Sequence, residues 1–289
     1  MVTFVLFGIV GLVAQLIGGA LGMGHGVIST SLLLTVGVAP AAASASVHLA
    51  EMGTMLTSSV AHWRYGNVDW RVVLRVAIPG AVGAFAGATV LSSLPAQQAA
   101  PWISAILIVI GTWLVVRFVN HRHDNPPPRP PLRTRFLAPL GLIAGTVDAT
   151  GGGGWGPIAT SAMLVSGRLE PRKVVGSASV AKFMVSTGAS AGFLFGMTDS
   201  GVVWPVVLAL LLGGLIAAPF AAWLVRRLPT WVLGVAVGGL IILINARTVL
   251  DALGAPIAIY VATFAVLLAA WSVALTVAIR VRRAEPARV

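Results

Sequence analysis

Long apolar segments follow one another along almost the whole chain, and short polar or basic stretches separate them. The apolar segments run over residues 4–35, 44–61, 72–92, 99–118, 136–165, 174–196, 202–225, 230–246 and 255–279. Most are close to the length of about 20 residues with which a helix crosses the apolar core of a bilayer. The pattern predicts an all-α protein with many membrane-spanning helices.

Two of these segments, 4–35 and 136–165, are too long and too rich in glycine for one straight helix. A continuous helix over residues 4–35 would be about 48 Å long, against an apolar bilayer core of roughly 30 Å. Glycine clusters interrupt both segments, with GGALGMGHG in the first and TGGGGWGP in the second. Because glycine and proline weaken a helix interior, we predict two half-helices joined by an unwound turn in each segment. Such backbone is tolerated at membrane depth only where it is buried in protein or lines a cavity.

The two broken segments belong to an internal duplication with an offset of 130 residues. Nine residues of the first half meet identical residues in the second at this offset: Gly11, Leu12, Ala14, Gly22, Gly24, Gly26, Ile28, Thr30 and Ser31. A second match places SASVHLAEM against SASVAK, so that Glu51 corresponds to Lys182. We therefore divide the chain into a first repeat (1–119), a Pro/Arg-rich linker (120–135), a second repeat (136–250) and an extra helix with a basic tail (251–289). Internal duplication is typical of transporter folds.

The charge distribution predicts how the protein lies in the membrane. Charged residues make up 9% of the chain and hydrophobic residues 57%, which excludes an ordinary water-soluble domain. The net charge of +11 comes mainly from arginines between the apolar segments, so it indicates membrane orientation and not nucleic acid binding. The basic loops lie near 62–75, 117–135, 167–173, 226–227 and 280–288.

These loops all fall on the cytoplasmic side only if both broken segments are re-entrant. The sequence then predicts a multi-pass protein of the plasma (inner) membrane, with its N-terminus outside and its C-terminus in the cytoplasm. Each half contributes a re-entrant helix pair and three transmembrane helices. The two halves are inverted, and the last helix is an additional span.

Few ionisable residues interrupt the apolar segments, and each is a functional candidate because a charge inside a membrane is costly. They are His25, His48, Glu51, Asp148 and Lys182. Glu51 and Lys182 either form a structural ion pair or line a transport path, where Lys182 would attract an anion. Glu51 is predicted to carry a coupling proton, which His48, one turn earlier on the same helix face, could share. Asp148 either caps the second half-helix or takes part in the coupling.

The glycine clusters predict an anion site between the two breaks, because free N–H groups at helix N-termini attract anions. The predicted anion-binding residues are Gly22, Gly24, His25, Gly26, Gly152, Gly153, Gly154, Trp155, Gly156 and Lys182. The alternative for the glycines is close helix packing, and for Trp155 a packing or plug role. Hydroxyl groups that follow the breaks are further candidate donors: Ser29, Thr30, Thr160 and Ser161.

The motif DATGGGGWGP at 148–157, its counterpart in the first half and SVHLAE at 46–51 resemble the TauE/SafE family of sulfite exporters. This family is also called the four-TMS sulfite uptake permease superfamily, and the resemblance covers roughly residues 5–250. It implies a secondary transporter of sulfite, sulfoacetate, thiosulfate or a related organosulfonate, and we expect proton-coupled export.

Two other functions remain open at this point. A passive anion channel would use the same glycine-lined cavity. An intramembrane enzyme is disfavoured, because the chain has no cysteine and no HExxH. We expect no enzymatic activity, no cofactor and no metal site. The expected partners are a small sulfur-containing anion and the lipid bilayer, and the oligomeric state stays open.

Overall fold

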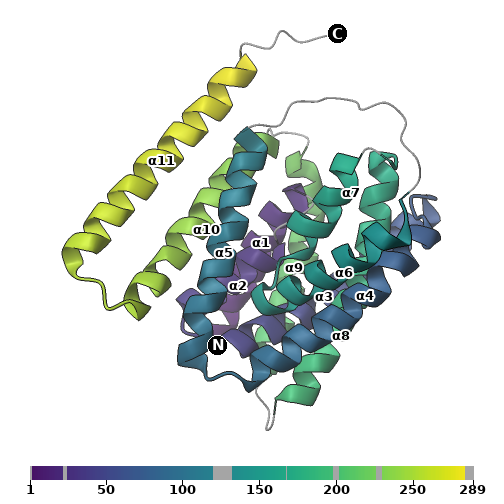
Figure 1. The fold of residues 1–289 in the computed structure, drawn as a ribbon, viewed down its shortest axis with the longest axis horizontal. Coiled ribbons are helices and arrows are strands. Elements are labelled where there is room, and N and C mark those ends of the chain that lie inside the picture. Colours follow the sequence, from purple (N-terminus) through teal and green to yellow (C-terminus); the bar gives the residue numbers. More distant parts are fainter. Residues whose placement is uncertain are drawn as a thin grey trace.

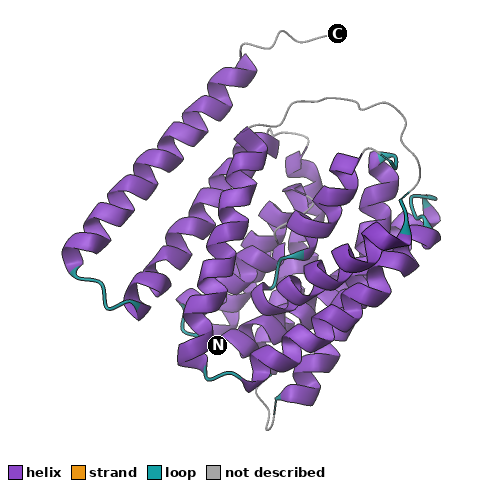
Figure 2. Ribbon diagram, in the orientation of Figure 1, coloured by secondary structure: helices purple, strands orange, loops and turns teal. Residues whose placement is uncertain are grey.

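The computed structural model describes residues 2–21, 25–119, 132–166, 168–197, 202–225 and 230–283. Nearly all of this described chain is helical, and Figure 2 shows no strand in it. The elements in chain order are α1 (Val2–Leu21), α2 (His25–Thr35), α3 (Pro40–Arg64), α4 (Trp70–Ser93), α5 (Ala96–Val119), α6 (Thr134–Gly151), the π-helical turn η1 (Trp155–Thr160), α7 (Ser161–Ser166), α8 (Pro171–Gly196), α9 (Trp204–Val225), α10 (Thr230–Ala252) and α11 (Ile257–Arg283).

Five helices of the described chain are long and apolar enough to cross a membrane: α4, α5, α8, α10 and α11. The apolar stretch of α11 buries none of its residues in the protein, and Figure 1 shows this helix at the edge of the bundle beside α10. A long apolar helix with most of its surface exposed needs lipid as its surroundings. The predicted class, an all-α polytopic membrane protein, is confirmed.

Both long apolar segments contain separate helices, as predicted. The first holds α1 and α2 on either side of residues 22–24, which lie outside the described residues. In the second, α6 ends at Gly151 and the next residue, Gly152, has a left-handed φ of +69° that favours glycine. Helical structure resumes at Trp155, so the break covers only three residues. Figure 2 shows a short loop inside the helical bundle, and not at its ends.

Most of the predicted linker, residues 120–131 of 120–135, lies outside the described residues. Helix α6 begins at Thr134. The last helix of the second repeat, α10, continues to Ala252, beyond the apolar run that ended at residue 246. These shifts of a few residues leave the order of elements unchanged.

The helices of the two repeats pack in an exchanged manner. Helix α4 of the first repeat packs against α6 and α8 of the second, while α9 of the second packs against α1 and α3 of the first. Glycines bring the backbones together. A methyl group added at Gly83 would lie 2.2 Å from the carbonyl oxygen of Leu142, and one added at Gly213 would lie 2.2 Å from that of Gly8. Gly83 and Gly213 correspond to each other at the offset of 130 residues, so the α4–α6 and α9–α1 contacts both depend on a glycine at the same place in the repeat.

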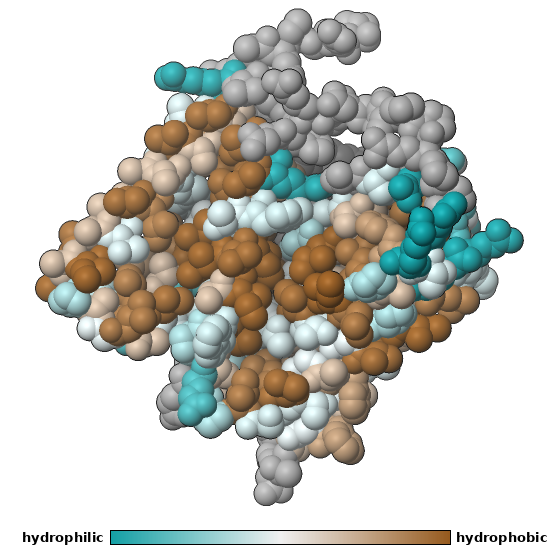
Figure 3. Space-filling model, viewed as in Figure 1, coloured by the Kyte–Doolittle hydropathy of each residue, from teal (hydrophilic) through white to brown (hydrophobic). Residues whose placement is uncertain are grey.

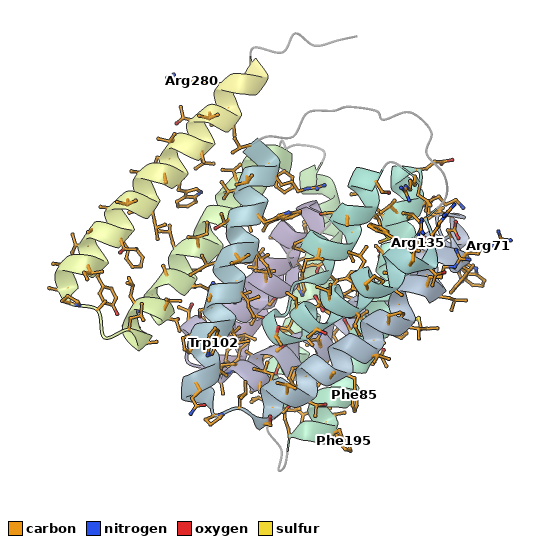
Figure 4. All side chains as sticks on the ribbon, viewed as in Figure 1. Arg71, Phe85, Trp102, Arg135, Phe195 and Arg280 are labelled. Carbon is orange, nitrogen blue, oxygen red and sulfur yellow. The ribbon has the colours of Figure 1, made fainter. Side chains whose placement is uncertain are left out.

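The labelled arginines and the Phe85–Phe195 pair lie at different ends of the bundle. Figure 3 shows apolar residues over most of the visible face, with hydrophilic residues gathered near its upper right edge. In Figure 4, Arg71 and Arg135 lie at that edge and Arg280 lies near the top, at the end of α11. Phe85 and Phe195 lie together at the lower end, with their ring centroids 5.9 Å apart.

Candidate functional site

The start of α2 lies directly against the second glycine-rich break in the centre of the bundle. A methyl group added at Gly26, in the first turn of α2, would lie 1.3 Å from the carbonyl oxygen of Gly152. One added at Gly152 would lie 2.0 Å from the hydroxyl oxygen of Thr30, and one at Gly153 would lie 1.9 Å from Val27. Only glycine allows these backbones to approach so closely. Close packing, the alternative reading of the clusters, therefore describes these three glycines.

Asp148 closes the second break. One carboxylate oxygen, Oδ1, accepts the backbone N–H of Trp155 at 3.0 Å, which caps the first turn of η1. The backbone carbonyl of Asp148 accepts the N–H of Gly152 at 2.6 Å. The indole N–H of Trp155 donates to the carbonyl of Ala178 at 3.1 Å. Both N–H groups of Trp155 are thus bound by the protein itself.

Four ionisable side chains from three helices meet beside this break. The Lys182 Nζ atom of α8 lies 2.5 Å from Oδ2 of Asp148 and 2.9 Å from Oε2 of Glu51. The Nδ1 atom of His48 lies 3.4 Å from the same Glu51 oxygen. All four residues are buried, and Lys182 is the most exposed of them at 8%. We call His48, Glu51, Asp148 and Lys182 the charge cluster.

The charge cluster is held in place by its neighbours. The second ring nitrogen of His48, Nε2, lies 3.1 Å from the backbone carbonyl of Asp148, and the imidazole stacks on Phe193 with ring centroids 6.3 Å apart. The hydroxyl of Ser186, one turn after Lys182, donates to Oε2 of Glu51 at 3.3 Å. One positive charge thus faces two carboxylates in a buried site, with a histidine that can take up a proton.

His25 borders the cluster from the first break. Its neighbour Gly26 is so close to Glu51 that an added methyl group would lie 3.1 Å from Oε1 of that carboxylate. The His25 side chain is half-buried, and its Nδ1 atom is buried without a hydrogen-bond partner. Thr30 has a buried hydroxyl without a hydrogen-bond partner at the junction of the two breaks.

The structure brings the predicted residues together to different degrees. His48, Glu51, Asp148 and Lys182 form direct contacts, and His25, Gly26, Gly152 and Trp155 surround them. Gly22 and Gly24 lie outside the described residues. A methyl group on Gly154 would lie 2.6 Å from the backbone nitrogen of Asp148, and Gly156 lies within η1.

Several buried residues of the bundle, two of them beside the cluster, were absent from the sequence prediction. Ser186 lies one helical turn after Lys182, and this spacing could have identified it. Asn245 of α10 is 1% exposed and donates to the hydroxyl of Ser31 at 2.9 Å. A polar amide within an apolar run could have identified it as a functional candidate from the sequence. The contact between Phe193 and His48 joins two distant segments, and neither sequence segment indicates it.

Comparison with known proteins identifies relatives of this chain. Residues 7–248 match the family described as sulfite exporter TauE/SafE. The chain is 48% identical over 248 residues to the probable membrane transporter protein YtnM of Bacillus subtilis (strain 168), covering 86% of this chain and 83% of that protein. Two other proteins of the same organism match at lower identity. They are the probable membrane transporter proteins YunE (23% over 271 residues, 86% of this chain and 98% of YunE) and YdhB (25% over 221 residues, 76% and 88%). No solved structure matches the chain.

Proposed function

The chain belongs to the TauE/SafE sulfite exporter family, and we propose that it is a secondary transporter that exports a small sulfur-containing anion together with a proton. The candidate anions are sulfite, sulfoacetate, thiosulfate and related organosulfonates. The observation that carries this proposal is the Lys182 ammonium, which is buried in the middle of α8 between two carboxylates. A buried charge inside a membrane protein is expensive, so it is typical of a substrate or ion path.

Lys182 is the group we assign to the anion. Its ammonium has three N–H donors, and the two carboxylates that it contacts are themselves anions. A sulfonate or sulfite oxygen offers the same kind of acceptor as a carboxylate oxygen. His25 lies next to this position and has a free ring nitrogen, so we place it at the edge of the anion site.

The proton is assigned to the remaining members of the charge cluster. His48, Glu51 and Asp148 can each bind a proton, and they lie within contact distance of Lys182 or of one another. A proton that neutralises one carboxylate removes a competitor for the ammonium. Anion binding and proton binding at this site then support each other.

We propose that the two repeats are inverted, with re-entrant pairs α1–α2 and α6–η1–α7, the N-terminus outside and the C-terminus in the cytoplasm. The exchanged packing of α4 with α6 and of α9 with α1 supports a twofold relation between the halves. Figure 4 supports the orientation, because Arg71, Arg135 and Arg280 lie toward one end of the bundle and Phe85 and Phe195 toward the other. Rocking of one half against the other around a central site would give alternating access.

Transport by purified protein in liposomes tests the function. Vesicles would be loaded with radiolabelled sulfite, thiosulfate, sulfate or an organosulfonate, and release would be followed with and without a pH gradient across the membrane. We expect release of at least one sulfur oxyanion, and we expect the pH gradient to change its rate. Release that ignores the gradient and does not saturate would favour a passive channel.

The matched control is a lysine outside the site. Lys173 lies near the start of the same helix, where its ammonium donates to the carbonyl of Gly66 at 2.7 Å. Lys173→Met should transport like the wild type, while Lys182→Met should not transport. If no sulfur oxyanion moves with the wild-type protein, the proposed function is wrong.

A further inference from the structure

Two donor groups, from Lys182 and Ser186, and a ring nitrogen of His48 converge on one oxygen of Glu51. Lys182 Nζ lies 2.9 Å from Oε2, the hydroxyl of Ser186 donates to it at 3.3 Å, and His48 Nδ1 lies 3.4 Å from it. All of these side chains are buried. Donors of this kind, arranged around a single charged oxygen, form a binding site for one oxygen of an oxyanion.

We propose that the Glu51 carboxylate occupies the place of the transported oxyanion in this structure, and that one proton on Glu51 releases Lys182 and Ser186 to bind that anion. This rests on the proposed function and adds two statements to it. Ser186 is a substrate-binding residue, and Glu51, not Asp148, is the carboxylate that exchanges with the substrate.

Asp148 is fixed and Glu51 is not. Asp148 holds the N–H of Trp155 through Oδ1, so its departure would uncap the turn that resumes after the break. Among the described residues, the Glu51 carboxylate makes its polar contacts with the side chains of Lys182, Ser186 and His48. Its helix also becomes more exposed one turn further on, at Met55, whereas Asp148 is completely buried. The Glu51 side chain can therefore turn away without breaking a backbone hydrogen bond.

The charge cluster has one negative charge more than it has positive charges, so it can take up one proton. The groups that face Glu51 are Lys182 from α8, His48 on its own helix, Asp148 from α6 and His25 from α2. With neutral histidines, one ammonium stands against two carboxylates, and one negative charge remains unbalanced in a buried site. One added proton balances it.

The orientation of His48 indicates where this proton lies. Nε2 faces the backbone carbonyl of Asp148, which can only accept, so Nε2 carries a hydrogen. In a neutral ring Nδ1 then has a lone pair and faces the Glu51 carboxylate, another acceptor. A proton taken up by the cluster would therefore bind between Nδ1 and Oε2, and it would remove this conflict whichever of the two atoms holds it.

The exchange is then a balanced step. A proton binds a Glu51 oxygen and forms an O–H bond, and the neutral side chain turns toward Met55. One oxygen of the anion accepts hydrogen bonds from the Lys182 ammonium and the Ser186 hydroxyl in its place. The protein gains one proton and one negative charge together, so a monovalent anion and a proton are bound and carried in the same direction.

Binding and proton uptake by the purified protein test this exchange. Methanesulfonate and ethanesulfonate are suitable probes, because both are monovalent anions that stay fully ionised near neutral pH. Titration in weakly buffered detergent solution should show about one proton taken up per monovalent anion, and an affinity that falls by about tenfold per pH unit on the alkaline side. Glu51→Gln, which mimics the protonated acid, should bind the anion with no proton uptake and no pH dependence.

Two further variants on α8 separate binding from coupling. Ser186→Ala should weaken binding on the order of tenfold while proton uptake per bound anion stays the same. Thr187→Ala changes the exposed neighbouring residue and should bind like the wild type. The melting temperature of each variant would show that it is folded.

Failure of this inference differs from failure of the proposed function. If the wild type binds the probes with no proton uptake, or if folded Glu51→Gln binds nothing, Glu51 does not exchange with the anion. Wild-type strength of binding by Ser186→Ala removes that residue from the site. Transport of a sulfur oxyanion by the wild type would leave the proposed function standing in each of these cases.

Discussion

Helices α3 and α8 hold corresponding positions in the two repeats, yet they differ in what surrounds them. Glu51 of α3 and Lys182 of α8 align in the duplication, and their charged groups lie 2.9 Å apart. Each helix thus supplies one charged side chain to this contact. Beyond it, the same face of each helix meets a different environment.

The α8 face that carries Lys182 is closed. Ser186, Ala189 and Phe193 follow Lys182 at intervals of four, seven and eleven residues and so lie on its face of the helix. All three are 0% exposed. Phe193 also stacks on His48, which covers the charge cluster from this end.

The α3 face that carries Glu51 is open. Met55, Ser58 and His62 follow Glu51 at the same intervals, and all three are only half-buried. We call these three residues the α3 strip. The strip leads from the charge cluster to the end of α3 at Arg64, next to a basic loop.

The neighbours of the two helices account for this difference. Helix α8 packs closely on α4, where a methyl group added at Gly188 would lie 2.5 Å from the backbone carbonyl of Ala81. Helix α3 meets α9 less closely, and Gly53 faces only the end of the Leu211 side chain, at 2.8 Å for an added methyl. Two related sequences thus adopt two different packings in one molecule, as an alternating-access transporter requires of its halves.

The largest expected effect comes from removing the charge on the closed side. Lys182→Met leaves Glu51 and Asp148 as two buried carboxylates without their ammonium partner. Breaking a buried ion pair in this way costs about 3–5 kcal/mol of stability. We expect a clear drop in the melting temperature of the purified protein in detergent.

The matching change on α3 provides the contrast. Glu51→Gln leaves Lys182 paired with Asp148, so the loss of stability should be much smaller. Lys173→Met, outside the cluster, should melt like the wild type. Equal losses for Lys182→Met and Glu51→Gln would contradict the different roles of the two helices.

Much of this architecture could be predicted from the sequence, because it depends on local patterns. The apolar runs predicted the spans, and the second glycine cluster predicted the break that the structure shows at residues 152–154. The duplication also aligned Glu51 with Lys182, and the structure shows these two residues in contact. The shorter contact, from Lys182 to Asp148, could not be read in this way, because the residue of the first repeat that corresponds to Asp148 is Gly18.

The glycine clusters show a second limit of the sequence. Glycine in a membrane protein permits either a cavity or close packing, and the same glycine pattern in the sequence is compatible with both. The choice depends on what lies opposite. For Gly26 the opposite group is the carbonyl of Gly152, from a segment more than a hundred residues away. The exposure of the α3 strip likewise depends on how α3 packs against α9, which no local pattern records.

A smaller effect is expected from glycines at the two helix interfaces. Gly188→Ala places a methyl group against the backbone of α4, which cannot move aside alone, so we expect a loss of about 1–3 kcal/mol. Gly53→Ala meets only a flexible leucine end, and alanine favours a helix by up to about 1 kcal/mol over glycine. Thermal unfolding of both variants should show destabilisation by the first and little change or a gain from the second. The reverse order would mean that α3, and not α8, is the tightly packed helix.

The last prediction concerns water on the two faces, and the chain suits it because it contains no cysteine. Ser58→Cys and Ala189→Cys place a single thiol seven residues after Glu51 and Lys182, respectively. A membrane-impermeant maleimide needs a water-exposed thiolate, and a buried thiol is inert. We expect Ser58→Cys to react on the order of tenfold faster, which corresponds to about 1.4 kcal/mol in the accessible population. Thr57→Cys is the matched control, because residue 57 is exposed but turned by about 100° from Ser58 around the helix. We expect that face to lie in lipid, so this thiol should react slowly. Labelling in sealed vesicles also gives the side, since the reagent should reach Ser58→Cys from the side of the basic loops. Similar rates for Ser58→Cys and Ala189→Cys would show that water reaches both halves alike, and the asymmetry between α3 and α8 would then not describe the protein in a membrane.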